Sequence, residues 1–398
     1  MVKKAIIAII LSIILITASV YAICNQYYNS PSPTSSSSNP SNRNPSSGDT
    51  STDSSTSTDS SPSSSNAKGS ASTNNTTIQV TDGAGYNVHI DSYPKRVLVM
   101  DPGLAEIMYI LGATDLIVAR TDLVVFPTQL QSVPSVGLYA YTLSLEAILE
   151  VEPDLIISSS QFGYNPVYHQ IVDMGIPVYL ESSETPSAVD TSKMTAEELY
   201  NYPTRIDVIC DAMKGISELV GRKGNMDEYI AWTQGYNKLV KDRIATLPRD
   251  QLVSVFYEWN AYPYRTYVDM SVYQGGGFNI AEQAYREYTS TLNPEFVVEQ
   301  NPSVIIELIS SDNHNVNDFI ATKNAVINRS ATQGVDAVKN GRVYVCDFAA
   351  RNGLRAVIGY VYFATWIQPE FFSDINPGTV SQELTQKFGI SVSGTYCY

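Results

Sequence analysis

Histidine, cysteine and basic residues are all scarce in this chain of 398 residues. It has 3 histidines and 4 cysteines, and its 25 Lys and Arg are outnumbered by 40 Asp and Glu, which gives a net charge of -15. The cysteines show no C-x-x-C spacing, which argues against a zinc knuckle and a thioredoxin-like redox site. The acidic balance argues against nucleic acid and anionic lipid as main partners, since both are bound through Lys and Arg.

Two further absences concern catalysis and metal binding. The sequence has no nucleophile elbow, no H-E-x-x-H motif and no phosphate-binding loop, so we expect a protein that is not an enzyme and needs no cofactor. A free metal-ion site needs three or four converging His, Asp or Glu side chains, whereas His89, His169 and His314 are dispersed. A free metal-ion binding protein and a cell-surface adhesion module stay open as alternatives.

The N-terminal residues predict export from the cytoplasm. Residues 1–24 place Lys3 and Lys4 before an apolar run, which is typical of a signal peptide or an N-terminal anchor. Cleavage after Ala22 is permitted, and lipidation of Cys24 stays open. Residues 25–77 are rich in Ser, Thr, Asn and Pro, which predicts a disordered stalk. We therefore expect a protein tethered to the outer face of the cell membrane, or secreted or periplasmic if the signal is cleaved.

One stretch of the chain occurs twice. The sequence LSLEAILEVEPDLII at 143–157 recurs without a gap at 292–306 as LNPEFVVEQNPSVII, with six identical positions. Apolar residues at helical spacing, a proline and then a short apolar run predict a short helix followed by a buried strand in each copy. A repeat about one domain length apart predicts two similar α/β lobes.

Strands and helices alternate through the rest of the chain, which predicts mostly parallel sheets. The predicted fold class is α/β, with two parallel-sheet sandwich lobes joined by one long rigid helix. We place the N-terminal lobe at 78–204, the connecting helix region at 205–247 with a break at Gly221 to Gly224, and the C-terminal lobe at 248–398. Such a connection is expected to resist hinge motion.

A ligand crevice in open parallel sheets lies beyond the carboxyl ends of the strands. Tyr, Trp and Phe at such ends suit a large, partly apolar ligand, and Arg suits its carboxylates or phosphate. The residues predicted to line the crevice are Tyr139, Tyr141, Phe162, Tyr164, Trp259, Tyr262, Arg265, Arg351 and Arg355.

Motifs spread over residues 78–372 together resemble a known family, the extracytoplasmic substrate-binding proteins of ABC importers for iron-siderophores, haem and cobalamin. The motifs are PKRV at 94–97, LAEIMYILGA at 104–113, PDLII at 153–157, GIPV at 175–178, GGFNI at 276–280 and VKNGRVY at 338–344. The resemblance implies two α/β lobes with a rigid helical connection. It also implies that a cobalamin-like corrinoid, an iron-siderophore or haem binds in the cleft between the lobes. The family often has Arg-Pro-Gly-Pro-Arg before the last helix, and residues 351–355 keep both arginines without the prolines.

The resemblance also gives a role to two of the repeated glutamates. In the family, glutamates at the positions of Glu146 and Glu295 project from the lobe tips and bind arginines on the membrane subunits of the importer. Equivalent positions in two lobes lie far apart, so this pair does not predict a carboxylate pair for hydrolysis. The implied partners are a chelated-metal ligand and the membrane subunits of an ABC importer, with a membrane tether through the N-terminus and no nucleic acid.

Overall fold

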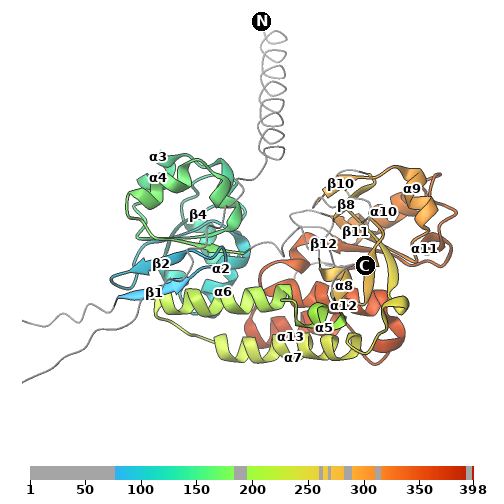
Figure 1. Cartoon of the computed structure of the whole chain (residues 1–398). Coiled ribbons are helices and arrows are strands. Elements are labelled where there is room, and N and C mark those ends of the chain that lie inside the picture. The colour runs from blue at the N-terminus through green and yellow to red at the C-terminus, as the bar shows by residue number, and fades with distance from the viewer. Residues whose placement is uncertain are drawn as a thin grey trace, which may run out of the picture. The chain divides into compact units, whose positions relative to one another are not determined.

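A computed structural model describes residues 77–182, 195–259, 263–267, 270–281, 289–309, 315–390 and 397–398. The predicted signal or anchor and almost all of the predicted stalk lie outside the described residues. Two α/β lobes are present, one drawn from blue to green and one from orange to red in Figure 1. No helix in the described ranges combines the length and the apolar character needed to cross a membrane.

The first lobe contains an antiparallel hairpin and a parallel sheet in the order β4-β3-β5-β6. The hairpin consists of β1 (Ile78–Thr81) and β2 (Asn87–Ile90). The sheet strands are β3 (Val97–Val99), β4 (Ile117–Arg120), β5 (Leu155–Ser159) and β6 (Val178–Glu181). Its helices are α2 (Pro102–Ile110), α3 (Leu145–Glu150) and α4 (Val167–Asp173), with 3-10 turns η1 (Thr114–Leu116), η2 (Thr128–Ser132), η3 (Ala140–Thr142) and η4 (Ser160–Tyr164).

The second lobe is built on a larger mixed sheet in the order β10-β8-β7-β11-β12, with β9 also paired to β7. Its strands are β7 (Val253–Trp259), β8 (Arg265–Tyr267), β9 (Gly277–Asn279), β10 (Thr289–Thr291), β11 (Val304–Ile309) and β12 (Val343–Asp347). Strands β7, β9, β11 and β12 are parallel, whereas β8 and β10 form antiparallel pairs. The predicted fold class is confirmed, and the antiparallel edge is an addition to it.

Several helices surround this sheet. They are α8 (Ser271–Gln274), α9 (Pro294–Gln300), α10 (Val316–Ile327), α11 (Asp336–Lys339), α12 (Ala356–Ile367) and α13 (Gly378–Phe388). The 3-10 turns are η6 (Arg249–Gln251), η7 (Phe348–Arg351), η8 (Gly353–Arg355) and η9 (Pro369–Phe372). The helix α12 has almost only apolar residues and is buried along most of its length, which makes it a core helix of the second lobe.

The repeated sequence has the same structure in both lobes. A capped helix, α3 or α9, leads through a buried proline into a buried strand, β5 or β11. Between helix and strand, Glu152 and Asn301 occupy equivalent positions and share the left-handed conformation, with φ of 44° and 42°. The sequence repeat therefore corresponds to a structural repeat, which extends to one shared backbone conformation.

The lobes are connected through α5 (Ala196–Asn201), α6 (Arg205–Val220) and α7 (Met226–Ile244). The predicted break is present, because Gly221 ends α6 in the left-handed conformation. Just before α7, Arg222 donates to the Gly112 carbonyl of the first lobe. In the last turn of α7, Arg243 donates to the Phe371 carbonyl of the second lobe. Thus α7 is the long connecting helix, and α6 packs along it (Figure 1).

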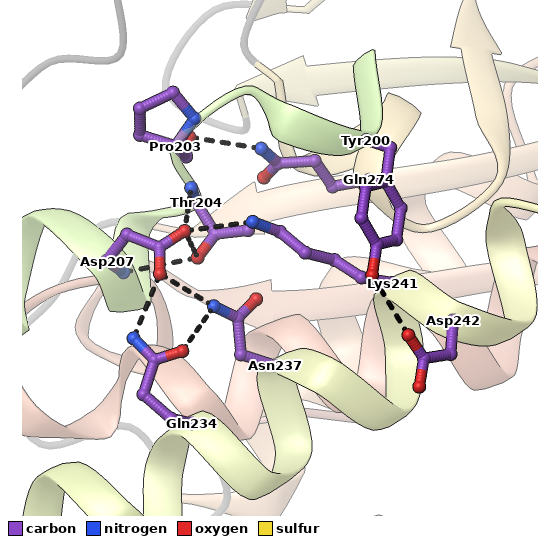
Figure 2. Close-up of polar contacts among 9 residues, drawn as sticks. All are labelled: Tyr200, Pro203, Thr204, Asp207, Gln234, Asn237, Lys241, Asp242 and Gln274. Carbon is purple, nitrogen blue, oxygen red and sulfur yellow. Dashed lines mark hydrogen bonds and ion pairs between the residues drawn. The ribbon is translucent and has the colours of Figure 1, made fainter. Parts of the chain in front are cut away.

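Polar side chains fasten α6 to α7 around one carboxylate, as Figure 2 shows. Asp207 forms a capping box with Thr204 at the start of α6 and also accepts hydrogen bonds from α7. Its partners on α7 are Gln234 at 2.9 Å, Asn237 at 2.8 Å and Lys241 at 3.0 Å. The connection is therefore a pair of helices with fixed register, which is stiffer than a bundle of extended linkers.

Candidate ligand cleft and docking glutamates

The carboxyl end of β3 brings the first lobe against the second. Asp101 follows β3 and caps α2, accepting from the Gly103 amide at 2.8 Å. A Cβ atom on Gly103 would lie 2.7 Å from the Cα of Gly353, which follows η7 in the second lobe. Gly353 also has φ of +54°, a conformation that favours glycine. The two backbones approach this closely only because both residues lack a side chain.

An ion pair lies directly beside this glycine contact. Glu106 of α2 pairs with Arg355 of η8, and its Oε2 accepts from the Leu354 amide at 3.0 Å. The Arg355 guanidinium also lies over the Phe126 ring, 5.6 Å from its centroid. Glu106 is buried and Arg355 is nearly so. Arg355, predicted from sequence as a ligand residue, thus points into the boundary between the lobes and pairs with the first lobe.

A second acid–base pair lies at the carboxyl end of β6. Glu181 pairs with Arg205 of α6 at 2.8 Å, and Arg205 also donates to the Ser182 carbonyl at 2.6 Å. Burial, with a smaller contribution from the nearby Asp101, raises the pKa of Glu181 to about 7 against the opposing effect of Arg205. Burial also raises the pKa of Asp101. The site therefore holds two carboxyl groups that bind protons more readily than in water.

A small pocket adjoins Arg205. Its lining residues are Arg205, Ser271, Gln274, Arg351, Ala356, Gly359, Tyr360 and Phe363. Arg351 donates to the Ser271 hydroxyl at 3.2 Å and lies 5.2 Å from the centroid of the Tyr257 ring. The pocket has a volume of about 10 Å³, which is room for about one water molecule. Arg351, another residue predicted from sequence, therefore lies at a pocket with a second arginine, but the pocket is small.

The predicted tyrosines of the first lobe form an exposed aromatic surface. Tyr139 and Tyr141 stack with ring centroids 5.2 Å apart and planes inclined by 11°, and Tyr164 is 75% exposed. The Asn165 side-chain amide donates to the carbonyls of Ala140 and Leu143, both at 3.0 Å. Asn165 therefore holds the loop that carries Tyr139 and Tyr141 to the loop that carries Tyr164. All three tyrosines are exposed.

The remaining predicted ligand residues are placed differently. Phe162 is fully buried and packs edge-on against Tyr168, so its ring belongs to the lobe core and we withdraw it from the ligand set. The position of Phe162 in η4 places its ring on the side of this turn that faces the sheet. Trp259 is half-buried and stacks on Phe348 at 6.0 Å. Arg265 lies on β8 opposite Thr291, and Tyr262 lies outside the described residues.

The two repeated glutamates occupy matching places. Glu146 lies in the first turn of α3 after the N-cap Ser144, and Glu295 lies in the first turn of α9 after the N-cap Asn293. Both side chains are exposed. In each lobe this helix lies at the end remote from α6 and α7 (Figure 1). Each glutamate is also at a helix N-terminus, where the helix dipole favours a negative charge.

Sequence reasoning missed Glu106, Phe126 and Arg205. A signal existed for Glu106, because it is a lone carboxylate inside the apolar stretch LAEIMYILGA. Arg205 follows Thr204, which caps α6, and nothing in the sequence connects it to Glu181. Within the described ranges no three His, Cys, Asp or Glu side chains are grouped so that they could hold a metal ion.

Comparison with known proteins agrees with this architecture. The model of the family described as periplasmic binding protein matches residues 97–350. The chain is 24% identical over 305 residues to YvrC of Bacillus subtilis, named an uncharacterized ABC transporter substrate-binding lipoprotein, covering 75% of this chain and 87% of YvrC. It is 23% identical to the cobalamin-binding protein of Halobacterium salinarum, covering 66% and 68%, and 21% identical to the molybdate-binding protein MolA of Haemophilus influenzae, covering 62% and 70%.

Solved structures show the same fold. The TroA-like periplasmic binding protein FepB from Veillonella parvula superposes with a TM-score of 0.64 at 19% identity, covering 81% of this chain and 99% of FepB. MolA bound to molybdate superposes with a TM-score of 0.59 at 20% identity, covering 79% and 98%. Together with the two lobes, the helical connection and the family match over most of the folded part, these findings show that the chain belongs to the periplasmic binding protein family.

Proposed function

We propose that this substrate-binding protein captures a metal chelate, either a cobalamin-like corrinoid or an iron-siderophore or haem, between its lobes and delivers it to an ABC importer. The observation that carries the proposal is the meeting of arginines at the boundary between the lobes. Arg205 and Arg351 line one pocket, and Arg355 crosses to Glu106. The names of the relatives, which are binding proteins, support a role in binding and releasing a ligand without catalysing a reaction.

The surrounding side chains suit an anionic ligand with apolar area. Guanidinium groups pair with carboxylates and phosphates through two parallel hydrogen bonds. The stacked Tyr139 and Tyr141, and the half-buried Trp259, offer flat apolar faces with polar edges. Corrinoids, haem and many siderophores combine these two properties.

The size of the pocket sets a condition on this proposal. Ligand pockets for molecules of this kind usually have about 300 to 1,000 Å³. Because the pocket beside Arg351 has about 10 Å³, a chelate enters only when the lobes separate at the Glu106–Arg355 pair and at the Gly103–Gly353 contact. Arg355 would then exchange a protein carboxylate for a ligand carboxylate or phosphate. The charge of Arg355 would then be compensated both before and after the exchange.

A second candidate ligand is a small oxyanion such as molybdate, and the pocket itself favours it. Two guanidinium groups and the Ser271 hydroxyl surround a space of about one water molecule, which is closer in size to a tetrahedral oxyanion than to a corrinoid. MolA, one of the relatives, is named a molybdate-binding protein. An oxyanion of this kind requires little separation of the lobes.

Delivery would use the exposed glutamates. We propose that Glu146 and Glu295 bind arginines on the membrane subunits of the importer, one in each lobe. The predicted signal or anchor at 1–24 and the stalk at 25–77 would hold the protein outside the cell membrane, and YvrC is named a lipoprotein. The lobe limits at 78–204 and 248–398, and the connection at 205–247, stay predictions.

The experiment that tests the ligand class uses the protein without added ligand and then with probes. Visible absorbance of the freshly purified protein detects a retained corrinoid, haem or ferric chelate. Calorimetric titration with cyanocobalamin, haemin, a ferric siderophore and sodium molybdate follows. The proposal expects tight binding of one chelate, weakened at least tenfold by Arg351→Ala.

The outcomes separate the two candidates. Binding of molybdate alone would replace the chelate by the oxyanion. Cooperative thermal unfolding shows whether the purified protein is folded. If the folded protein binds neither class of ligand, the arginines serve the contact between the lobes and not a ligand.

A further inference from the structure

Two cysteines lie opposite each other where the last residues of the chain pair with β12. Cys346 of β12 forms an antiparallel bridge with Cys397, the penultimate residue. Next to them, Val345 and Tyr398 exchange both backbone hydrogen bonds, each of 2.8 Å. The cysteines therefore occupy the adjacent non-hydrogen-bonded position, where facing side chains are closest.

The side chains of this pair are close enough to bond. Their Sγ atoms are 3.6 Å apart, and both residues are buried. Facing residues of an antiparallel pair have Cα separations within the range that disulfides span, so a small rotation of the side chains brings the sulfurs to bonding distance. Cys210, in α6, is also buried and is bonded to neither of them.

We propose that Cys346 and Cys397 form a disulfide in the mature protein. The inference uses the proposed location outside the cytoplasm, where disulfides form and persist. It concerns neither the ligand nor the importer, so it stands apart from the proposed binding function.

The reaction is an exchange with a disulfide-containing oxidant such as oxidised glutathione or a disulfide oxidoreductase. The thiolate of one cysteine attacks a sulfur of the oxidant, forms a mixed disulfide and releases a thiolate of the oxidant. The second cysteine then attacks the first sulfur and releases the other half of the oxidant as a thiolate. The two thiols lose two protons and two electrons, and the oxidant disulfide takes up the electrons.

The order of events follows from burial. Burial and the neighbouring Cys346 raise the pKa of Cys397 well above its ordinary value, so a thiolate is disfavoured once the C-terminal residues lie against β12. The attacking thiolate therefore forms more readily while the last residues are still detached from the strand. We infer that the bond closes during folding, as the C-terminus reaches β12.

The cross-link has a structural consequence for the cleft. It closes a loop that contains α12 and α13, and it fixes Cys397 and Tyr398 beside the end of β12. The next residue, Asp347, accepts from the Ala349 amide at 2.7 Å and caps η7, which ends at Arg351. The bond would thus anchor the strand end that positions an arginine of the candidate site.

Counting free thiols in the denatured, unreduced protein tests the bond. Relative to the wild type, we expect one additional thiol in Cys346→Ser, no change in Cys346→Ser/Cys397→Ser and one thiol fewer in the control Cys210→Ser. If the pair is not bonded, Cys346→Ser will instead lose one thiol and the double variant two. Peptide mapping without reduction should show Cys346 and Cys397 in one linked pair.

The free thiols are also counted in full-length protein that has been refolded with oxidised glutathione. This experiment tests the disulfide without relying on the proposed location outside the cytoplasm. Pairing of Cys346 with Cys397 in that protein supports the bond, and its absence overturns the proposal. Reduction should lower the Tm of the paired protein by about 5 to 10 °C, as for a loop of this length, and leave the Tm of the double serine variant unchanged. An equal effect of reductant on both proteins would count against a stabilising cross-link.

Discussion

Several buried charges in the described residues occur as acid–base pairs that join different segments of the chain. Glu106 meets Arg355, Glu181 meets Arg205, and the fully buried Glu258 accepts from Arg329 at 2.7 Å. Removing one partner of such a pair leaves an uncompensated buried charge, at a cost of about 3 to 5 kcal/mol. Substitutions in these pairs therefore need controls for stability as well as for binding.

The titration of Glu181 predicts how stability depends on pH. Its pKa in the folded protein is about 7, above the ordinary value of 4.5, because the carboxyl group is buried. Between these two values the folded protein binds more protons than the unfolded chain, so the free energy of unfolding falls as pH rises from 4.5 to 7. In Glu181→Gln this contribution is absent, and the Tm should decline less with pH over the same interval.

Thermal unfolding at a series of pH values measures this effect. Burial also raises the pKa of Glu307, with the same sign, but Glu307 is unchanged in the variant, so the difference between the two curves isolates Glu181. Glu370→Gln, at an exposed position, serves as the control and should follow the wild type. Parallel curves for Glu181→Gln and the wild type would contradict the assignment.

Three substitutions test the ligand surface at the scale of single side chains. Tyr139→Ala, Trp259→Ala and Arg355→Ala should each weaken binding of the identified ligand by about 1 to 3 kcal/mol, the usual cost of losing an aromatic or charge-assisted anchor. Phe371→Ala removes an exposed aromatic ring from η9, beyond the far end of α12, and should leave affinity unchanged. Calorimetry of all four variants measures the effect. Unchanged affinity in the first three would show that the ligand binds elsewhere.

At the scale of helices and strands, the repeated motif was predictable because its signals are local. Pro153 and Pro302 end a helix whatever the rest of the chain does, and the short apolar runs after them are buried as strands. The antiparallel strands β8 and β10 were not predictable, since they depend on pairing with β7. The same holds for the pairing of Glu181 with Arg205, because no local pattern links residues on a strand and a later helix. Phe162 was misplaced because strand-end position alone does not give side-chain direction.

The pairing of α6 with α7 predicts the effect of one substitution. In Asp207→Asn the side chain loses its charge and part of its bonding to Lys241, Gln234 and Asn237, shown in Figure 2. Hydrogen bonds to charged groups contribute about 1.5 to 3 kcal/mol each, and the amide retains some of them, so we expect a loss of about 2 to 4 kcal/mol. Urea unfolding measures the loss.

A matched control exists on the same helix. Asp211 is exposed and pairs with the exposed Lys214 three residues later, so Asp211→Asn should cost less than about 0.5 kcal/mol. If the two substitutions cost the same, the carboxylate of Asp207 does not fasten the helices, and the stiffness of the connection has another source.

At the scale of the whole molecule, the lobes share one apolar core through the connecting helices. The largest buried cluster includes Val99 of the first lobe, Ile216 of α6, Tyr229 of α7, and Ile306 and Val357 of the second lobe. The opening proposed above at Gly103 and Gly353 would therefore have to keep the core along α6 and α7 intact. A core shared in this way limits how far the two outer helices, α3 and α9, move apart when the lobes open.

This limited change in separation underlies the prediction for docking. Glu146 and Glu295 lie at the same point of the same helix in the two lobes, so a pseudo-two-fold protein presents them to a two-fold transporter as a matched pair. A charge pair that is partly desolvated on docking loses about 2 to 5 kcal/mol when one partner is removed, and a fully exposed pair loses less than about 1 kcal/mol. Glu146→Arg and Glu295→Arg should each weaken the complex with the importer, and the double variant should weaken it more.

The measurement is transporter affinity and ligand affinity on the same set of proteins. Ligand affinity and Tm should stay at wild-type values, because both glutamates are exposed and lie on helices remote from the glycine contact. Glu218→Arg makes the same charge change at an exposed position of α6 and should leave docking intact, which separates a specific contact from general electrostatic attraction. Loss of ligand binding with docking preserved would place these glutamates in the ligand site. Equal weakening by Glu218→Arg would mean that only the net charge matters, and the repeat would then need a reason other than docking.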